Sequence, residues 1–213
     1  MHHRVLVPEG RGDCEWLRLL ADVVETGDAA FGKAPKESAP FGAVVGVVPT
    51  TDSAVTETYG HLRPLRSGFL AVVDGDDEGD DKIQKLLGLA EPPEQILQWP
   101  DDCEIEDIIK WVLDADPVNA IRMLQPRLSG YTFTSTQGLL NLMQVKSGTP
   151  RFKTDYLAYE EVASVVQEID ACRDRAAEVL DAITAAALGR SSSRLRVDST
   201  RSIRLCQVVR FVQ

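Results

Sequence analysis

The sequence predicts an α/β protein in which helices flank a parallel β-sheet. Along the first half of the chain, short apolar runs alternate with segments whose apolar residues recur at helical spacing. The apolar runs are nearly continuous, as is typical of strands that are buried on both faces. A chain of 213 residues, of which 44% are hydrophobic, is also long enough to bury a core of this kind.

Strands and helices alternate in this first half. The predicted strands are residues 4–7, 43–48, 68–73 and 96–99. The predicted helices are residues 14–25, 50–59, 82–87 and 104–113. Thr50 or Thr51 would cap the second helix, because a threonine hydroxyl accepts a hydrogen bond from a free N–H of the first turn. Residues 27–40, rich in Gly, Ala, Lys and Pro, are predicted to form a loop.

The second half of the chain is predicted to be mainly helical. Residues 118–128 and 159–188 carry helical patterns, and residues 203–212 have the apolar character of a final strand. A polar connector with three basic residues lies at 146–155. The predicted regions are an α/β core at residues 1–115, an added helical subdomain at residues 116–190 and a basic C-terminal segment with the final strand at residues 191–213.

The net charge of −10 is unevenly distributed. Residues 74–107 contain 13 acidic residues and two lysines, a balance of −11, so the rest of the chain sums to +1. A uniformly acidic surface would repel nucleic acid, but local acidity can be neutralised by bound cations. The C-terminal segment is basic and is a candidate for phosphate contacts. The arginines of the last two dozen residues are Arg190, Arg194, Arg196, Arg201, Arg204 and Arg210.

Several classes of protein are disfavoured. No apolar run approaches the roughly 20 residues that cross a bilayer, and no signal peptide is evident, so we expect a cytoplasmic protein with no membrane partner. The four cysteines are scattered, which predicts reduced thiols in place of a zinc site or disulfide framework. The three histidines give little support to histidine catalysis, since His2 and His3 stand at the start and His61 fits an ordinary loop or helix end.

Carboxylates follow the predicted strands at the points where they end. Glu9 and Asp13 follow the first strand, Asp74 and Asp76 the third, and residues 104–107 the fourth. Because ligands collect at the carboxyl ends of parallel strands, we expect these acids to converge. A carboxylate at the tip of a buried strand is costly without a positive partner, which favours a bound divalent metal. Hard oxygen ligands of this type suit Mg²⁺ or Mn²⁺.

Two other motif interpretations fail on a single position each. Residues 74–85 match the start of a calcium-binding loop, but Lys85 stands where the bidentate carboxylate is required. Residues 27–34 nearly match a phosphate-binding loop, but Ala34 replaces the hydroxyl residue that would hold magnesium. The second stretch also follows a helix where a strand is expected, so we interpret it as a linker.

Together, Val7-Pro8-Glu9-Gly10-x-x-Asp13 and Val73-Asp74-x-Asp76, with Gly79 shortly after, resemble the Toprim domain shared by topoisomerases, primases and some nucleases. Residues 104–109, which open a helix after the fourth strand, look like the acidic helix of the OLD (overcoming lysogenization defect) family nucleases. Residues 151–155 look like part of the nuclease region of that family. The resemblance is specific over residues 5–110 and looser beyond them. Pro8 departs from the usual apolar residue, which a strand end tolerates.

The resemblance implies a set of site residues. The implied metal ligands are Glu9, Asp13, Asp74, Asp76, Glu104, Glu106 and Asp107. Glu9 and Asp13 would hold one ion, and Asp74 and Asp76 would hold or bridge ions. Glu106, with Asp107 or Glu104, would complete a second site. The implied catalytic residues are Glu9, Asp13, Asp74, Asp76 and Lys153, the last stabilising charge on the phosphate, with Lys146 and Arg151 as rivals.

The implied activity is hydrolysis of DNA phosphodiester bonds with two Mg²⁺ or Mn²⁺ ions, with Ca²⁺ as a non-catalytic substitute. OLD proteins carry an N-terminal ATPase domain, so we expect the chain to be the nuclease region of a longer protein. Three alternatives stay open: a metal-ordered interaction module without catalysis, a primase or topoisomerase fragment, and solvated acids on an α/β fold. A topoisomerase needs a nucleophilic tyrosine, and none stands in a recognisable context.

Overall fold

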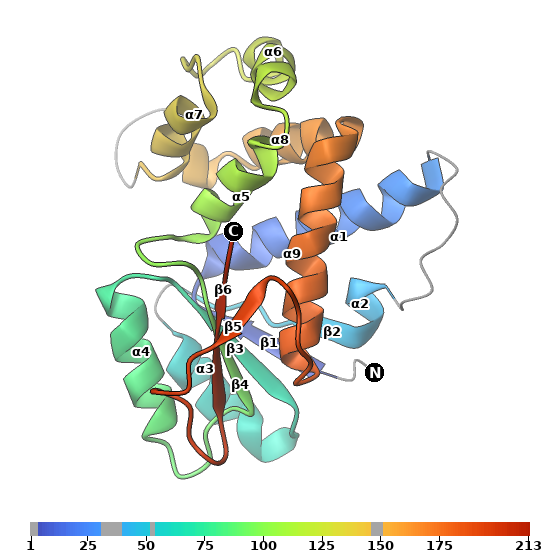
Figure 1. Cartoon of the computed structure of the whole chain (residues 1–213). Coiled ribbons are helices and arrows are strands. Elements are labelled where there is room, and N and C mark those ends of the chain that lie inside the picture. Colours follow the sequence, from blue (N-terminus) through green and yellow to red (C-terminus); the bar gives the residue numbers. More distant parts are fainter. Residues whose placement is uncertain (1–3, 31–39, 52–53, 146–150) are drawn as a thin grey trace. The chain divides into compact units, whose positions relative to one another are not determined.

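The computed structural model describes residues 4–30, 40–51, 54–145 and 151–213 (Figure 1). Within these residues the chain divides into two compact units. The sheet unit comprises residues 4–17, 40–105 and 179–213. The helical unit comprises residues 18–30 and 106–178. Each unit is described separately below.

The sheet unit contains a six-stranded, mostly parallel sheet with the strand order β2-β1-β3-β4-β6-β5. In chain order its strands are β1 (Arg4–Pro8), β2 (Val45–Val47), β3 (Phe69–Val73), β4 (Gln95–Gln98), β5 (Leu195–Val197) and β6 (Gln207–Phe211). All neighbouring strands are parallel except β5, which runs antiparallel to β6. The α/β class and the mostly parallel sheet flanked by helices are thus confirmed. Pro8 is the last residue of β1, where a missing N–H is tolerated.

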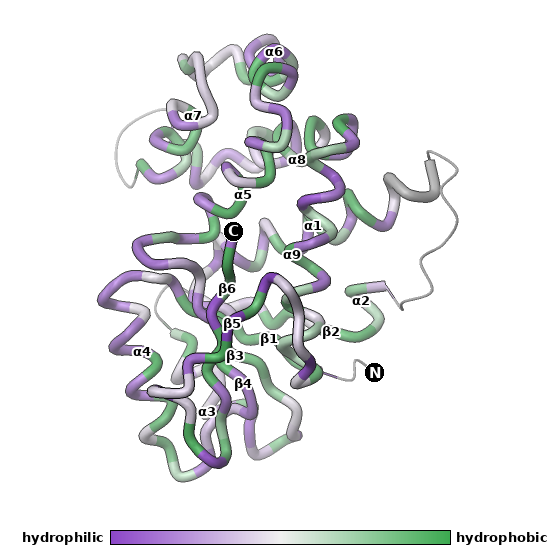
Figure 2. The backbone as a smooth tube through the Cα atoms, viewed as in Figure 1, coloured by the Kyte–Doolittle hydropathy of each residue, from purple (hydrophilic) through white to green (hydrophobic). Residues whose placement is uncertain are grey.

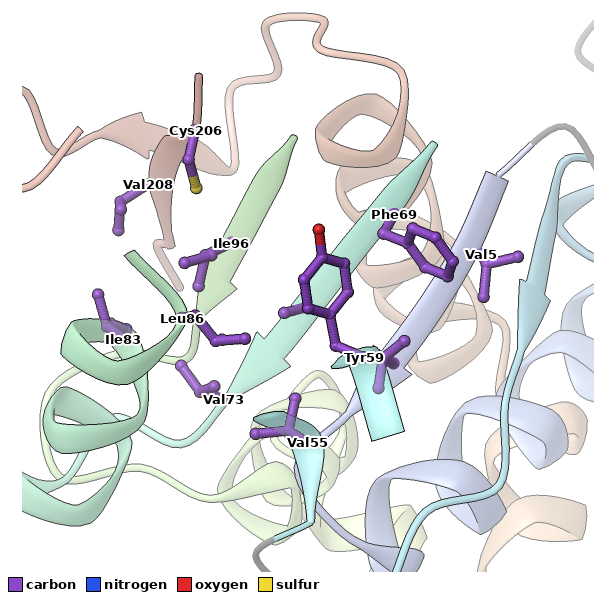
Figure 3. Packing of buried hydrophobic residues seen from close by; sticks show 12 residues of the cluster. Val5, Val55, Tyr59, Phe69, Val73, Ile83, Leu86, Ile96, Cys206 and Val208 are labelled. Carbon is purple, nitrogen blue, oxygen red and sulfur yellow. The ribbon is translucent and has the colours of Figure 1, made fainter. Parts of the chain in front are cut away.

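Helices α3 (Val55–Leu62) and α4 (Asp77–Leu87) pack on the sheet. Figure 3 shows their side chains over the apolar residues of β1, β3, β4 and β6. Tyr59 of α3 meets Phe69 edge to face, with ring centroids 5.3 Å apart. Ile83 and Leu86 of α4 are fully buried in the same cluster. Hydrophilic residues predominate in α4, as Figure 2 shows, and acidic residues occupy its first turn.

The remaining elements of the sheet unit are short or belong to it in part. They are α2 (Phe41–Val44), the 3₁₀ turn η1 (Arg63–Leu65), the start of α1 (Arg11–Ala30) and the end of α9 (Asp170–Ala187). Leu6, Leu70 and Leu97 of the central strands are fully buried. The sheet therefore forms the centre of the hydrophobic core of this unit.

The helical unit contains α5 (Ile105–Leu113), of which residues 106–113 belong to it, α6 (Pro117–Arg127), α7 (Thr136–Met143), the 3₁₀ turn η2 (Phe152–Thr154) and α8 (Tyr156–Glu168). Polar caps define where these helices begin. Asp116 accepts a hydrogen bond from the Asn119 N–H at the start of α6, and Asp155 accepts one from the Ala158 N–H at the start of α8. Buried Phe152 packs against Tyr131 and Tyr159, which fixes η2 against α8.

Several predicted element boundaries were wrong. The predicted strand at 43–48 is shorter, because residues 43–44 belong to α2. The helix predicted at 159–188 is two helices, interrupted at Ile169, whose backbone is extended. Helix α4 begins at Asp77, not at residue 82, because Asp76 caps it. The final strand is shorter than predicted, and strand β5 and helix α7 were not predicted.

The domain boundaries predicted at 115 and 190 differ from the observed units. Residues 207–211 form an interior strand of the sheet, so the C-terminal segment belongs with the α/β core. The loop predicted at 27–40 begins later, since α1 extends to Ala30. Residues 31–39 lie outside the described part of the chain, and with them the second half of the near-match to a phosphate-binding loop.

Candidate active site

The carboxyl ends of β1, β3 and β4 lie side by side in the sheet unit. Pro8 pairs with Val72, and Val73 pairs with Gln98, so the residues that follow these strands leave the sheet at one edge. The structure brings the acidic clusters that follow β1 and β3 together there: Glu9 Oε2 accepts a hydrogen bond of 3.0 Å from the Asp74 N–H. The two residues are 65 positions apart in the chain.

Glu9 is buried, with 8% of its surface exposed, and it forms an ion pair with Lys82 of α4. Only 5% of the Lys82 side chain is exposed, and its Nζ also lies 2.9 Å from Oε1 of Glu78. Burial acts to lower the pKa of Lys82, but hydrogen bonds and charges from Glu9 and Glu78 outweigh it, so the pKa is raised. Lys82 is therefore a buried cation held between two carboxylates.

Asp13 is also buried, with 5% of its surface exposed. It lies in the first turn of α1, where a negative charge is favoured by the helix dipole. Its Oδ1 accepts a hydrogen bond of 3.2 Å from the indole N–H of Trp99, and its Oδ2 accepts one of 3.3 Å from the Gly10 N–H. Trp99 follows β4 and is fully buried, so Asp13 is tied to the end of that strand.

The turn after β3 depends on two glycines. A Cβ atom on Gly75 would lie 1.7 Å from the carbonyl oxygen of Pro100, and one on Gly79 would lie 2.1 Å from that of Asp74. Asp76 caps α4 by accepting a 2.7 Å hydrogen bond from the Gly79 N–H. The Gly75 N–H donates to the Cys103 carbonyl at 2.8 Å, so the turns after β3 and β4 are joined.

We expect Gly75→Ala to destabilise the protein by about 2–3 kcal/mol, because the new methyl group collides with backbone that cannot rotate away. Gly60→Ala in α3 is the matched control, since nothing lies within 4 Å of the added Cβ. That change should stabilise the helix by about 0.5–1 kcal/mol. Urea denaturation of the three proteins measures both effects. A Gly75→Ala protein as stable as wild type would contradict the observed approach of the two turns.

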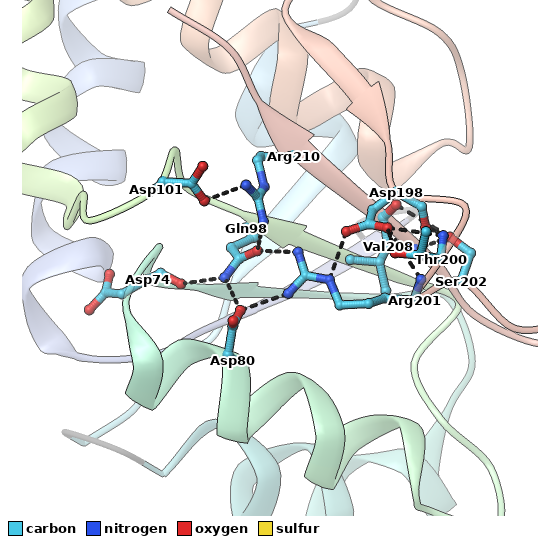
Figure 4. Close-up of polar contacts among 10 residues, drawn as sticks. All are labelled: Asp74, Asp80, Gln98, Asp101, Asp198, Thr200, Arg201, Ser202, Val208 and Arg210. Atoms are coloured by element: carbon cyan, nitrogen blue, oxygen red, sulfur yellow. Dashed lines mark hydrogen bonds and ion pairs between the residues drawn. The ribbon is translucent and has the colours of Figure 1, made fainter.

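Gln98 is the centre of a polar network beside this edge (Figure 4). It is 1% exposed, and its Nε2 donates to the Asp74 carbonyl at 3.2 Å and to Asp80 Oδ1 at 2.7 Å. Its Oε1 accepts from Arg201 at 2.6 Å and from Arg210 at 3.1 Å. The Asp74 carboxylate points away from this network (Figure 4).

The two arginines of this network also form ion pairs. Arg201 binds Asp80 and Asp198, each at 2.7 Å, and Arg210 binds Asp101. A hydrogen bond from Thr200, and further ones from Arg201, lower the pKa of Asp198 to about 2 against the effect of burial. Two of the six arginines that were candidates for phosphate contacts are thus paired with carboxylates of the same chain.

The other four predicted site residues belong to the turn after β4 and to the helical unit. Glu104 is a partly buried residue of the sheet unit. In the helical unit, Glu106 is 2% exposed and its Oε1 lies 3.3 Å from the Nζ of Lys153, whose side chain is 31% exposed. Asp107 accepts a 3.0 Å hydrogen bond from Gln144. Arg151 is exposed, and Lys146 lies outside the described residues.

The acids of the sheet unit have the right chemistry for a metal ion, but in the structure they are not arranged around one. Glu9, Asp13, Asp74 and Asp76 offer the carboxylate oxygens that Mg²⁺ and Mn²⁺ prefer. Among the described residues, however, no group of three or more His, Cys, Asp or Glu is arranged to hold an ion. Oxygens of Glu9, Asp13 and Asp76 are engaged by Lys82, Trp99 and backbone N–H groups.

Comparison of the chain with family models, curated proteins and solved structures finds no match. The likeness to Toprim and OLD nucleases therefore rests on the motifs described above. In the described part of the chain, no helix combines the length and apolar character needed to cross a membrane.

The four cysteines are free thiols. Burial raises the pKa of Cys172 to about 11 and that of Cys206 to about 12, which disfavours the reactive thiolate form of both.

Proposed function

We propose that the protein is a Mg²⁺- or Mn²⁺-dependent DNA endonuclease of the Toprim type, from the nuclease region of an OLD-like protein. One observation carries the proposal: the acidic side chains buried among the described residues are Glu9, Asp13 and Glu106. All three belong to the motifs that resemble those nucleases. Acids that served only solubility would lie in water, because burying a carboxylate is costly.

Glu9, Asp13, Asp74 and Asp76 of the sheet unit would hold the metal ions. When bound, two such ions generate a nucleophilic hydroxide from water and stabilise the leaving oxygen of the phosphodiester. The chain's own contribution is to position oxygens: the Asp74 N–H orients Glu9, Trp99 orients Asp13, and Gly79 fixes Asp76. The roles of Glu104, Glu106, Asp107 and Lys153 stay predictions from the resemblance.

The test uses the purified chain with supercoiled plasmid DNA. We expect Mg²⁺ or Mn²⁺ to support conversion to nicked and linear forms, and EDTA to abolish it. Ca²⁺ should bind without supporting cleavage. Intact plasmid with either catalytic metal, over a wide range of protein concentration, would overturn the proposal.

A second function is suggested by the hydrogen bonds that Glu9, Asp13 and Asp76 already accept from groups of the same chain. If the Glu9–Lys82 pair persists when metal is present, the acidic edge would serve only as a scaffold that docks a partner. A structural metal would raise the melting temperature without cleavage, because a ligand that binds only the folded state stabilises it. Thermal denaturation with and without Mn²⁺, run beside the plasmid assay, separates the two functions.

A further inference from the structure

Lys82 stands out as the buried lysine among the described residues, and it contacts a candidate metal ligand. Its helix, α4, begins with a run of acids that reads in sequence as a solvated face. A lysine side chain that is 5% exposed is unusual, since lysine is almost never fully buried unless it is paired. The Glu9 carboxylate, itself buried, is the partner that explains this position.

The ammonium and a divalent ion compete for the same oxygen. Lys82 Nζ donates a hydrogen bond to Glu9 Oε1, while Glu9 Oε2 accepts one from the Asp74 N–H. Without a counter-charge, the buried Glu9 carboxylate would be strongly disfavoured, so Lys82 stabilises it when metal is absent. A divalent ion at Glu9 would meet a like charge at close range unless the ammonium moved away.

The same ammonium already contacts a second carboxylate. Glu78 lies one helical turn before Lys82, with its Oε1 2.9 Å from the same Nζ, and its side chain is 61% exposed. Lys82 can therefore release Glu9 by a change of side-chain rotamer alone and keep a carboxylate partner in contact with water. The backbone of α4 need not move.

We propose that Lys82 is an intramolecular counter-ion that pairs with both Glu9 and Glu78 in the metal-free protein, and that it gives up Glu9 and keeps Glu78 when a divalent metal binds. The inference rests on the proposed function, because it takes Glu9 as a metal ligand. Lys82 thereby holds the Glu9 side chain in place until the metal arrives.

The first test compares Mn²⁺ affinity by titration calorimetry in wild type, Lys82→Met and Lys85→Met. Removing the competing ammonium should tighten Mn²⁺ binding by roughly 5- to 150-fold, the usual range for two coupled sites. Lys85 is an exposed lysine of the same helix, so Lys85→Met should leave the affinity unchanged. In EDTA, Lys82→Met should melt at a lower temperature than wild type, and Mn²⁺ should raise its melting temperature more.

The second test uses the wild-type protein, so that it decides the question even if Lys82→Met fails to fold. Acetylation of lysines, followed by mass spectrometry, should leave Lys82 protected in EDTA and label it faster in Mn²⁺. Lys85 should react equally under both conditions. Unchanged protection of Lys82 in saturating Mn²⁺, or an affinity unchanged by Lys82→Met, overturns the inference and leaves the proposed function standing. Absence of Mn²⁺ binding by both proteins overturns the proposed function as well.

Discussion

Replacing Asp74 with asparagine is expected to lower metal-dependent plasmid cleavage by about a thousandfold, equivalent to about 4 kcal/mol of transition-state stabilisation. Asp74 follows β3 directly, and its backbone is fixed by the Gln98 and Glu9 hydrogen bonds. The carboxylate itself points away from the Gln98 network (Figure 4). Asparagine has nearly the same shape, so the variant removes the charge that a hard divalent cation requires while leaving these backbone contacts intact.

Asp77→Asn is the matched control for this experiment. Asp77 lies three residues later, in the exposed first turn of α4, and the substitution changes the net charge by the same amount. We expect its cleavage rate to stay within about twofold of wild type, because only a helix-dipole contribution below about 1 kcal/mol to stability is lost. Gel densitometry of nicked and linear plasmid measures both rates. Equal loss of activity in the two variants would mean that general acidity, and not a site at Asp74, governs cleavage.

Much of the sheet was predictable because its signals are local. Continuous apolar runs such as residues 69–73 have few stable places other than the interior of a parallel sheet, and the structure contains β3 there. The boundaries that failed depend on tertiary contacts. Residues 43–44 are as apolar as a strand yet belong to α2, and β5 is an edge strand of three residues, two of them exposed. Its place is set by pairing with β6, which no local pattern reveals.

The sequence predicted that acids of the candidate site would meet, but it did not predict which side chains contact them. The spacing of strand ends predicted that Glu9 and Asp74 would meet, since parallel strands share one carboxyl edge. Lys82, Gln98 and Trp99 gave no signal. A lysine within an acidic run looks solvated, and a glutamine or tryptophan at a strand end looks like ordinary core. Each of these three residues contacts an acid that is distant in sequence, and such contacts can be identified only once the fold is known.

The basic C-terminal segment shows the same limit. Its charge suggested phosphate contacts, but Arg201 and Arg210 bind Gln98, and each pairs with acids of the same unit. Net charge counted along the chain does not distinguish arginines available to DNA from arginines that hold the fold together. In this protein the C-terminal arginines partly neutralise the acidic turns, and Gln98 links that neutralisation to the backbone of Asp74.

The Glu9→Gln variant is expected to lose about 1–3 kcal/mol of folding stability in EDTA, because the Lys82 ammonium loses its buried carboxylate partner and keeps only the exposed Glu78. Glutamine keeps the volume of the side chain and can still accept from the Asp74 N–H, so the loss reports the charge. Glu78→Gln removes the other carboxylate from the same ammonium. Since the Glu78 side chain is 61% exposed, that change should cost only about 0–1 kcal/mol.

A double-mutant cycle isolates the pair itself. Glu9→Gln with Lys82→Met removes both charges, and its cost should fall short of the sum of the two single variants by about 2–3 kcal/mol. Urea denaturation at neutral pH in EDTA measures all four proteins, with equal m-values as the check that the denatured states are comparable. Additive losses would show that Glu9 and Lys82 do not depend on each other. A large coupling would mean that the buried carboxylate is stable in the metal-free fold because the protein supplies its own cation, so a divalent ion must replace an existing partner there.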